Sequence, residues 1–389
     1  MTHRQGRLAV VGVAPVLAGA LALALILTSS SPDASGPQAV AADARCTVHA
    51  SSLAAAAGAI AHAHPGGVVC LTGGAYPGKL ALTAQPRGDV VLRGAPGAHV
   101  STGAILIAGS HIVVRGLWVH GEVALAAGDS HVTLEGNDIT GGGEGVVFDT
   151  SDCTAPNAPK WSGCVAQAPI SNVTISANRF HDIGTHGGED AIHLDNWRNV
   201  RIVGNEFAHI VETGEHTDCL QSVFGGSNLT FDHNYEHDND CQGFFVKDGD
   251  ATNVSFTDNL FVRDRIGSFA NFAQIWNVRG LTVRRNTIWD GKGLALVANE
   301  ASFAPTATID HNAIETLVVE RPVGNPYAIT EHDNIFGQAP WSFRASHSDR
   351  TAARPHFSDP RHDDYRLARN PRGIGVDWSP TTRHYGPGA

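Results

Sequence analysis

The most constraining feature of this sequence is a short phrase that recurs along the chain, an alternating apolar stretch that ends in asparagine. Four clear copies are NVTISANRF (172–180), NVRIVGNEF (199–207), NLTFDHNYE (228–236) and NVSFTDNLF (253–261). With the looser copies, the phrase supplies Asn137, Asn178, Asn205, Asn234, Asn259, Asn286, Asn312 and Asn334. These asparagines are separated by 41, 27, 29, 25, 27, 26 and 22 residues. A period in the twenties, built from short β-type segments, indicates a stack of similar coils.

Each phrase alternates in steps of two, as a strand with one buried face must. Asparagine suits the bend that follows, because it tolerates the left-handed conformation and its amide can hydrogen-bond locally. A β-propeller would need about 40 or more residues per repeat, and a leucine-rich repeat would need a Leu-x-x-Leu-x-Leu frame. The sequence therefore predicts an all-β fold, a right-handed parallel β-helix of roughly ten coils.

The N-terminus has the composition of an export leader. Arg4 and Arg7 precede an apolar run over 8–27, and AVAA at 39–42 fits a small-residue cleavage site. Residues 1–41 are therefore predicted to be a signal peptide and the protein to be secreted. The apolar run is 20 residues long, enough to span a bilayer, so an uncleaved membrane anchor is the alternative.

The remaining chain is predicted to hold three parts. The Ala-rich segment 42–67 is expected to form a short helix that caps the stack, since an uncovered end exposes strand edges. Coils are expected over 68–339, with a Pro-rich loop inserted at 151–169 that walls one face. The tail, 340–389, is aperiodic, and its segment PHFSDPRHDDYRLARNP resembles a closing segment common in exported β-helix proteins.

The six cysteines favour disulfides in an exported chain. The most local pairing is Cys46 with Cys70, Cys153 with Cys164, and Cys219 with Cys241. The last pair is separated by about one coil, and neighbouring coils lie ~4.8 Å apart, within the reach of a disulfide. No C-x-x-C spacing favours a metal site.

The charge pattern limits the classes of partner. The chain has 42% hydrophobic and 17% charged residues, which is typical of a folded protein, and its net charge is −11. Lysine and arginine are scattered without a basic run, which argues against nucleic acid or an anionic membrane surface as partner. We expect a monomer.

Polar side chains gather where the coils between residues 181 and 277 are aligned on their asparagines. Asp190 then stacks on Asp218 at the strand starts, and His193 stacks on Gln221 and Gln274 along the strand. Such a column offers the closely spaced donors and acceptors that a sugar polymer requires. Asp195 and Lys247 are expected near its far end. Further candidates for substrate binding are His216, Gln242 and Arg263, with Trp161, Trp197 and Trp276 for stacking on sugar rings.

The coil series resembles the uronate-polymer lyases related to alginate lyases and chondroitinase B, which carry a lysine base in an apolar-Val-Lys-Ser phrase. The matching phrase, FFVKDG (244–249), places the base at Lys247. A lowered pKa would let this amine abstract the proton α to a uronate carbonyl. The family's arginine, about one coil later, has no counterpart at that spacing, where Ser268 stands; Arg263 and Arg265 are nearest. The resemblance implies β-elimination of an acidic polysaccharide, with Lys247 and Arg265 as catalytic candidates.

A second resemblance is to polygalacturonase-type hydrolases, whose pattern is Asn-Thr-Asp, Asp-Asp-Cys and Gly-His-Gly in successive coils. This chain keeps Asp190 and Asp218, but Thr217 and Gln242 replace the second aspartate and the histidine. Two stacked carboxylates would act as acid and base, one raised in pKa by the other. The alternative function is therefore an inverting glycoside hydrolase.

Other interpretations of the same residues remain open. One alternative is a non-catalytic module that binds glycan or cell wall, with the polar column as its recognition surface. In a separate, purely structural interpretation, Asp190 and Asp218 hold turn amides, and His193 and Gln221 form a stacked ladder without a ligand. If the cluster binds a cofactor, calcium held by Asp190, Asp218 and Asp240 is favoured, because carboxylate oxygen dominates.

Overall fold

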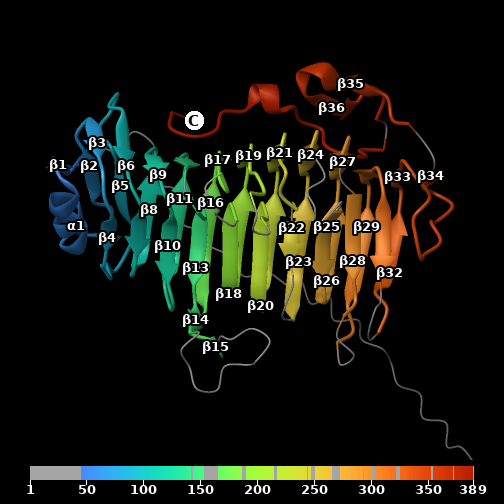
Figure 1. The fold of residues 1–389 in the computed structure, drawn as a ribbon, viewed down its shortest axis with the longest axis horizontal. Coiled ribbons are helices and arrows are strands. Elements are labelled where there is room, and N and C mark those ends of the chain that lie inside the picture. The colour runs from blue at the N-terminus through green and yellow to red at the C-terminus, as the bar shows by residue number, and fades with distance from the viewer. Residues whose placement is uncertain are drawn as a thin grey trace, which may run out of the picture. The chain divides into compact units, whose positions relative to one another are not determined.

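The computed structural model describes residues 45–141, 143–152, 165–185, 190–213, 217–242, 244–246, 250–264, 272–291, 293–299, 303–320, 325–351, 354–370 and 372–388. These residues form a parallel β-helix, as predicted, whose strands stack in chain order (Figure 1). Each full coil has three strands, and equivalent strands of successive coils pair in parallel to give three faces.

The first face holds the strands that precede the repeated phrase in each coil. They are β4 (Leu80–Leu82), β7 (Ile105–Ile107), β10 (Val123–Ala126), β13 (Val146–Asp149), the first parts of β18 (Ile192–Val203) and β20 (Leu220–Asp232), β22 (Phe244–Val246), β25 (Phe272–Trp276), β28 (Gly293–Val297) and β31 (Leu317–Glu320).

The second face carries the repeated phrase. Its strands are β1 (Val48–Ala50), β2 (Val68–Leu71), β5 (Val90–Gly94), β8 (Ser110–Arg115), β11 (Ser130–Glu135), β16 (Ile170–Ser176), the later parts of β18 and β20, β23 (Ala251–Thr257), β26 (Val278–Arg284), β29 (Thr306–Asp310) and β32 (Ala328–His332).

The third face follows the repeated asparagine. Its strands are β3 (Gly74–Tyr76), β6 (Val100–Thr102), β9 (Trp118–His120), β12 (Asp138–Thr140), β17 (Arg179–His181), β19 (Glu206–Ala208), β21 (Tyr235–His237), β24 (Leu260–Val262), β27 (Thr287–Trp289), β30 (Ala313–Ile314), β33 (Ile335–Phe336) and β34 (Arg350–Thr351).

Apolar residues at equivalent positions stack inside the coils. Phe180 pairs with Phe207 on the third face, and Phe231 pairs with Phe256 on the second face; all four are buried, and the ring centroids of the two pairs lie 5.0 and 5.6 Å apart. Because the in-register pairing repeats every coil, the period of two places each apolar residue of the phrase above its counterpart. The predicted alternation is therefore the packing pattern of the core.

The asparagines that end the phrase form a buried ladder, which we call the asparagine ladder. Asn205 Oδ1 accepts the backbone N–H of Asn178 at 2.9 Å and its side-chain N–H at 3.0 Å, while Asn205 Nδ2 donates to Ile175 O at 2.9 Å. This pattern continues along the stack and ends where Asn334 N donates to Asp349 Oδ1 at 2.7 Å.

The left-handed conformation that the sequence suggested for these asparagines was wrong. The left-handed residue is the one before each of them, such as Ala177 (φ 53°) or Asp258 (φ 54°). Most amide bonds connect neighbouring coils, and Asn312 and Asn334 also donate locally to the carbonyl two residues earlier. Left-handed asparagines occur instead at the start of the phrase. Asn172, Asn199, Asn228 and Asn253 have φ of 53–61° and form an exposed column through side-chain bonds of 2.8–3.1 Å.

The two ends of the stack differ. At the N-terminal end, helix α1 (Leu53–Ala61) begins after Ser52, whose Oγ accepts Ala55 N–H at 3.1 Å, and it buries Ala56 and Ile60 against the first coils. The predicted cap is confirmed, although its first part is strand β1. No helix in the described part of the chain is long and apolar enough to cross a membrane.

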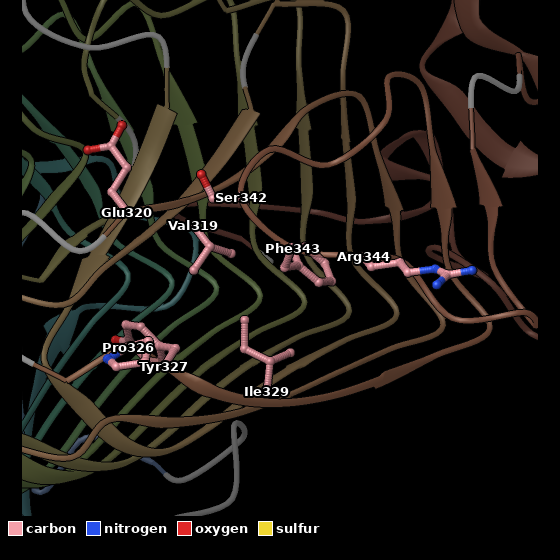
Figure 2. A pocket seen from close by; sticks show the side chains of 8 residues that line it. All are labelled: Val319, Glu320, Pro326, Tyr327, Ile329, Ser342, Phe343 and Arg344. Atoms are coloured by element: carbon pink, nitrogen blue, oxygen red, sulfur yellow. The ribbon is translucent and has the colours of Figure 1, made fainter.

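The C-terminal end is covered by irregular chain. Figure 2 shows Val319, Ile329 and Phe343 there, among the residues that line a hollow of about 780 Å³. The lining of this hollow includes none of the predicted site residues.

The tail folds back along the stack. After the antiparallel pair β35 (Phe357–Asp359) and β36 (Asp364–Leu367), residues 372–388 form what we call the strap, which runs toward earlier coils (Figure 1). Gly375 N donates to His311 O at 2.7 Å, Trp378 Nε1 to Asp258 O at 2.8 Å and Gly386 N to Ala177 O at 2.9 Å. The strap therefore lies over the bends between the second and third faces.

Two of the three predicted disulfides are confirmed. Cys46–Cys70 and Cys219–Cys241 each span 5.6 Å between Cα atoms. The predicted Cys153–Cys164 pair lies outside the described residues. The leader, 1–41, also lies outside them.

Candidate functional site

The first face brings together several of the predicted residues. His193 pairs with Gln221, Gln221 with Phe245, and Phe245 with Gln274, in successive coils. The predicted column is therefore present on one face, but Phe245 separates the two glutamines. At its far end, Trp276 Nε1 donates to Gln274 Oε1 at 2.9 Å.

Asp190 and Asp218 stack at the strand starts as expected, and we call them the carboxylate stack. Asp218 N–H donates to Asp190 Oδ1 at 2.7 Å, and Gln221 Nε2 donates to Asp218 Oδ2 at 2.9 Å. Both carboxylates are 0% exposed. Asp190 thus holds a backbone amide of the next coil, which is the structural role left open by the sequence.

His193 lies at the centre of the site and is surrounded by carboxylates. Its Nδ1 lies 2.9 Å from Glu144 Oε1 and 3.4 Å from Asp190 Oδ2, and its Nε2 lies 3.1 Å from Asp195 Oδ1. Burial lowers the pKa of His193, but hydrogen bonds to Asp195 and Glu144 outweigh it and raise the pKa to about 11. The side chain is therefore an imidazolium whose two N–H groups both donate to carboxylates.

Sequence reasoning missed Glu144. Val146 pairs with Ile192, so Glu144 and Asp190 both stand two residues before the first buried residue of their strands. Asp218 stands two residues before Leu220 in the same way. This recurring acidic position was the signal that would have identified Glu144, but the inserted loop obscured it.

The buried carboxylates influence one another. Burial, and then the charge of Asp218, raises the pKa of Asp190 well above its usual range, while His193 opposes the shift. Burial and the charge of Glu144 likewise raise the pKa of Glu122 one coil earlier. The early coils of this face are therefore acidic.

The predicted calcium ligands do not gather into one group. Glu144, Asp190 and His193 offer candidate ligand atoms within 4.8 Å of one another, but Asp240 is not part of this or any other such group among the described residues.

The other predicted residues lie in different places: Gln242 follows Asp218 in the next coil, and Arg263 lies on another face. Gln242 is 5% exposed, and its N–H donates to Thr217 O at 3.0 Å. Arg263 lies beyond β24 on the third face, where it bonds Tyr235 and Asp238 and pairs with Asp363 of the tail. It does not join the first-face site, because a coil of this length turns a residue 16 positions after Lys247 onto another face.

The last of the predicted residues are Trp197, which is buried, and four residues that lie outside the described ranges. Trp197 is fully buried, with Nε1 donating to Ser222 Oγ at 2.7 Å, so it belongs to the core and does not stack on a sugar. Lys247, Arg265, His216 and Trp161 lie outside the described residues.

Comparison with known proteins supports the fold. The family model described as a right-handed β-helix region matches residues 103–288. No curated protein sequence matches the chain.

Solved structures that resemble this chain include polysaccharide lyases. A rhamnogalacturonan lyase is 11% identical, with 82% of this chain and 88% of that one covered and a TM-score of 0.48. An alginate lyase in complex with G6 is 13% identical, with 87% and 93% covered and a TM-score of 0.48. A family 6 polysaccharide lyase from Pseudopedobacter saltans is 11% identical, with 86% and 100% covered and a TM-score of 0.45. By its strand pairing and by the family model, this chain is a right-handed parallel β-helix protein.

Proposed function

We propose that this protein is exported, binds an acidic polysaccharide along its first face and cleaves it by β-elimination, with Lys247 as the general base. The observation that carries the proposal is the register of β22, in which Phe245 stands in line with Gln221 and Gln274. Lys247 follows two positions after Phe245, so the period of two predicts the same side of the sheet for both. The two disulfides support an oxidising compartment.

Charge indicates where along the face the polymer binds. The coils that carry Glu122, Glu144 and Asp195 are acidic, and the imidazolium of His193 is already held by carboxylates. A polyuronate would be repelled there and would bind over later coils, where Gln221, Gln274 and Trp276 offer amides and a ring. Lys247 belongs to these later coils, and Arg265 is the candidate to neutralise the uronate carboxylate.

The hydrolase alternative receives less support. A general acid or base must come within hydrogen-bond reach of the substrate, whereas Asp190 and Asp218 are fully buried and bond groups of the protein itself. These residues and His193 connect neighbouring coils of the first face. Because both carboxylates are buried, non-catalytic binding of the polymer along this face is the second candidate.

Turnover of uronate polymers tests the proposal. Cleavage by elimination leaves an unsaturated uronate that absorbs in the ultraviolet. Lys247→Ala should lower kcat by about 10²–10⁴, the usual value of a general base, with an unchanged circular dichroism spectrum. Lys79→Ala, which removes an exposed lysine just before β4 of the same face, is the matched control and should retain activity.

Three results would contradict the proposal. Saturated products indicate hydrolysis, and full activity of Lys247→Ala removes the base. A protein that binds but does not shorten any uronate polymer is a recognition module.

A further inference from the structure

We propose that Asp310, His311 and His332 form a binding site for one late first-row divalent cation, with Zn²⁺ as the representative ion. The three side chains lie on the bend between the second and third faces, near the C-terminal end of the stack, far along the chain from the first-face site. Each offers a ligand atom within 4.8 Å of those of the other two. Asp310 pairs with His332 across β29 and β32, and His311 N–H donates to His332 O at 3.3 Å.

A buried oxygen of Asp310 points to a missing partner. The side chain is only 7% exposed, and its Oδ1 has no hydrogen bond from any described residue. Leaving a buried carboxylate oxygen without a donor is costly, so such an oxygen calls for a bound group. The other oxygen, Oδ2, lies 3.2 Å from His311 Nδ1 and forms an ion pair with Arg284 Nε at 3.6 Å.

The hydrogen bonds of the two histidines indicate which ring nitrogen each one offers to a metal. His332 Nδ1 lies 3.1 Å from Asp333 Oδ2, and a carboxylate that accepts from Nδ1–H fixes the tautomer and leaves the Nε2 lone pair for the metal. His311 Nδ1 lies 3.2 Å from Asp310 Oδ2, so His311 offers Nδ1, and the ion would replace the proton between these two atoms. The donors are thus two imidazoles and one carboxylate.

This donor set selects the kind of ion. Imidazole nitrogen suits zinc, copper, nickel and iron, whereas calcium prefers six to eight oxygen ligands. A three-ligand set also leaves positions for water, and His311 and His332 are 23% and 44% exposed, so the ion has access from solvent.

A second group of similar composition lies at the same bend in earlier coils, and its carboxylates receive hydrogen bonds from side chains outside the group. Asp232, His233 and Asp258 also lie within 4.8 Å of one another. Asp258 there receives two hydrogen bonds from Arg285, at 2.7 and 2.6 Å, and Asp232 receives Thr257 Oγ1 and His233. His233 and His311 both precede a ladder asparagine and have φ of 55° and 58°, so His233 is a matched control for His311.

The site would fasten the last coils to the tail. The ion would link β29 to β32, and Asp333, which orients His332, also bonds Arg372 of the strap at 3.0 Å. Binding to the folded state alone stabilises a protein in proportion to ligand concentration over Kd, so Zn²⁺ is expected to raise Tm.

The experiment uses the tag-free mature chain, stripped with a chelator. Zn²⁺ affinity is measured by competition with a chromophoric chelator, and bound Co²⁺ is followed by visible absorption. His332→Ala and His311→Gly should each weaken Zn²⁺ binding at least ~10–100-fold and abolish the Co²⁺ spectrum. Asp333→Asn should weaken binding without abolishing it, and Arg284→Gln should tighten it by removing a nearby positive charge.

His233→Gly should leave Zn²⁺ affinity unchanged. The proposal is overturned if the wild type binds no Zn²⁺, if it prefers Ca²⁺, or if His311→Gly and His233→Gly bind alike. Because the His332 side chain is partly exposed, its truncation should leave the coil stack folded, which circular dichroism verifies.

Discussion

The asparagine ladder and the carboxylate stack both join coils through buried polar side chains, yet one continues through the stack and the other stops after two residues. Every member of the ladder between Asn137 and Asn312 accepts from one coil and donates to another. Asp190 accepts from Asp218, and the series ends in the next coil, where Gln242 stands.

The difference follows from the inventory of donors and acceptors. An amide has both, so identical residues satisfy one another indefinitely, whereas an ionised carboxylate only accepts. The carboxylate stack therefore depends on outside donors, His193 and Gln221, and on the raised pKa of Asp190. A ladder of neutral amides can therefore extend through many coils, whereas stacked carboxylates are restricted to coils where other side chains donate to them.

Breaking the asparagine ladder at its centre should have the largest effect on stability. Asn234→Ala leaves the backbone and side-chain N–H groups of Asn205 without their acceptor and removes the donor to Ile202 O. Two buried donors without partners cost about 2–6 kcal/mol in total, measured as the free energy of unfolding in urea. Asn228→Gly, in the exposed column, should cost less than about 1 kcal/mol. Equal losses would show that burial does not distinguish the two columns.

The disulfide beside the carboxylate stack should have the next largest effect. Cys219–Cys241 closes a loop with a sequence separation of 22 residues at the point where the stack ends. Replacing both cysteines by alanine should lower the free energy of unfolding by about 3 kcal/mol. A loss near zero would contradict this expectation, because it would show that the disulfide does not stabilise the fold by restricting the unfolded chain.

The third expected effect is a change in the pH dependence of stability. His193 has a pKa raised from 6.5 to about 11, so its stabilising contribution is complete below pH 6.5 and is lost as pH rises toward 11. The difference in unfolding free energy between the wild type and His193→Gln should therefore shrink over this range. His120→Gln, which changes an exposed histidine of the third face, is the control variant. A constant difference for His193→Gln would show that His193 is not charged.

The sequence predicted the fold well, and the site only in outline. The spacing of the asparagines identified the coils, and the strand period placed His193 next to Gln221. The depth of Asp190 and Asp218 was not predictable, because an acidic residue beside a strand has the same sequence signature whether it faces water or the core. The partner of His193 was missed since Glu144 lies 49 residues away, across an inserted loop.

A repeated sequence by itself determines which residues are neighbours between coils, because every residue lies above the one a period away. The ladder, the stacked phenylalanines and the two disulfides all follow from that rule. Only the tertiary structure decided contacts that cross faces or return along the stack, such as Arg263 with Asp363 and Gly375 with His311. Those contacts depend on the length and direction of bends and on the path of an aperiodic tail. The sequence repeat contains no information about either.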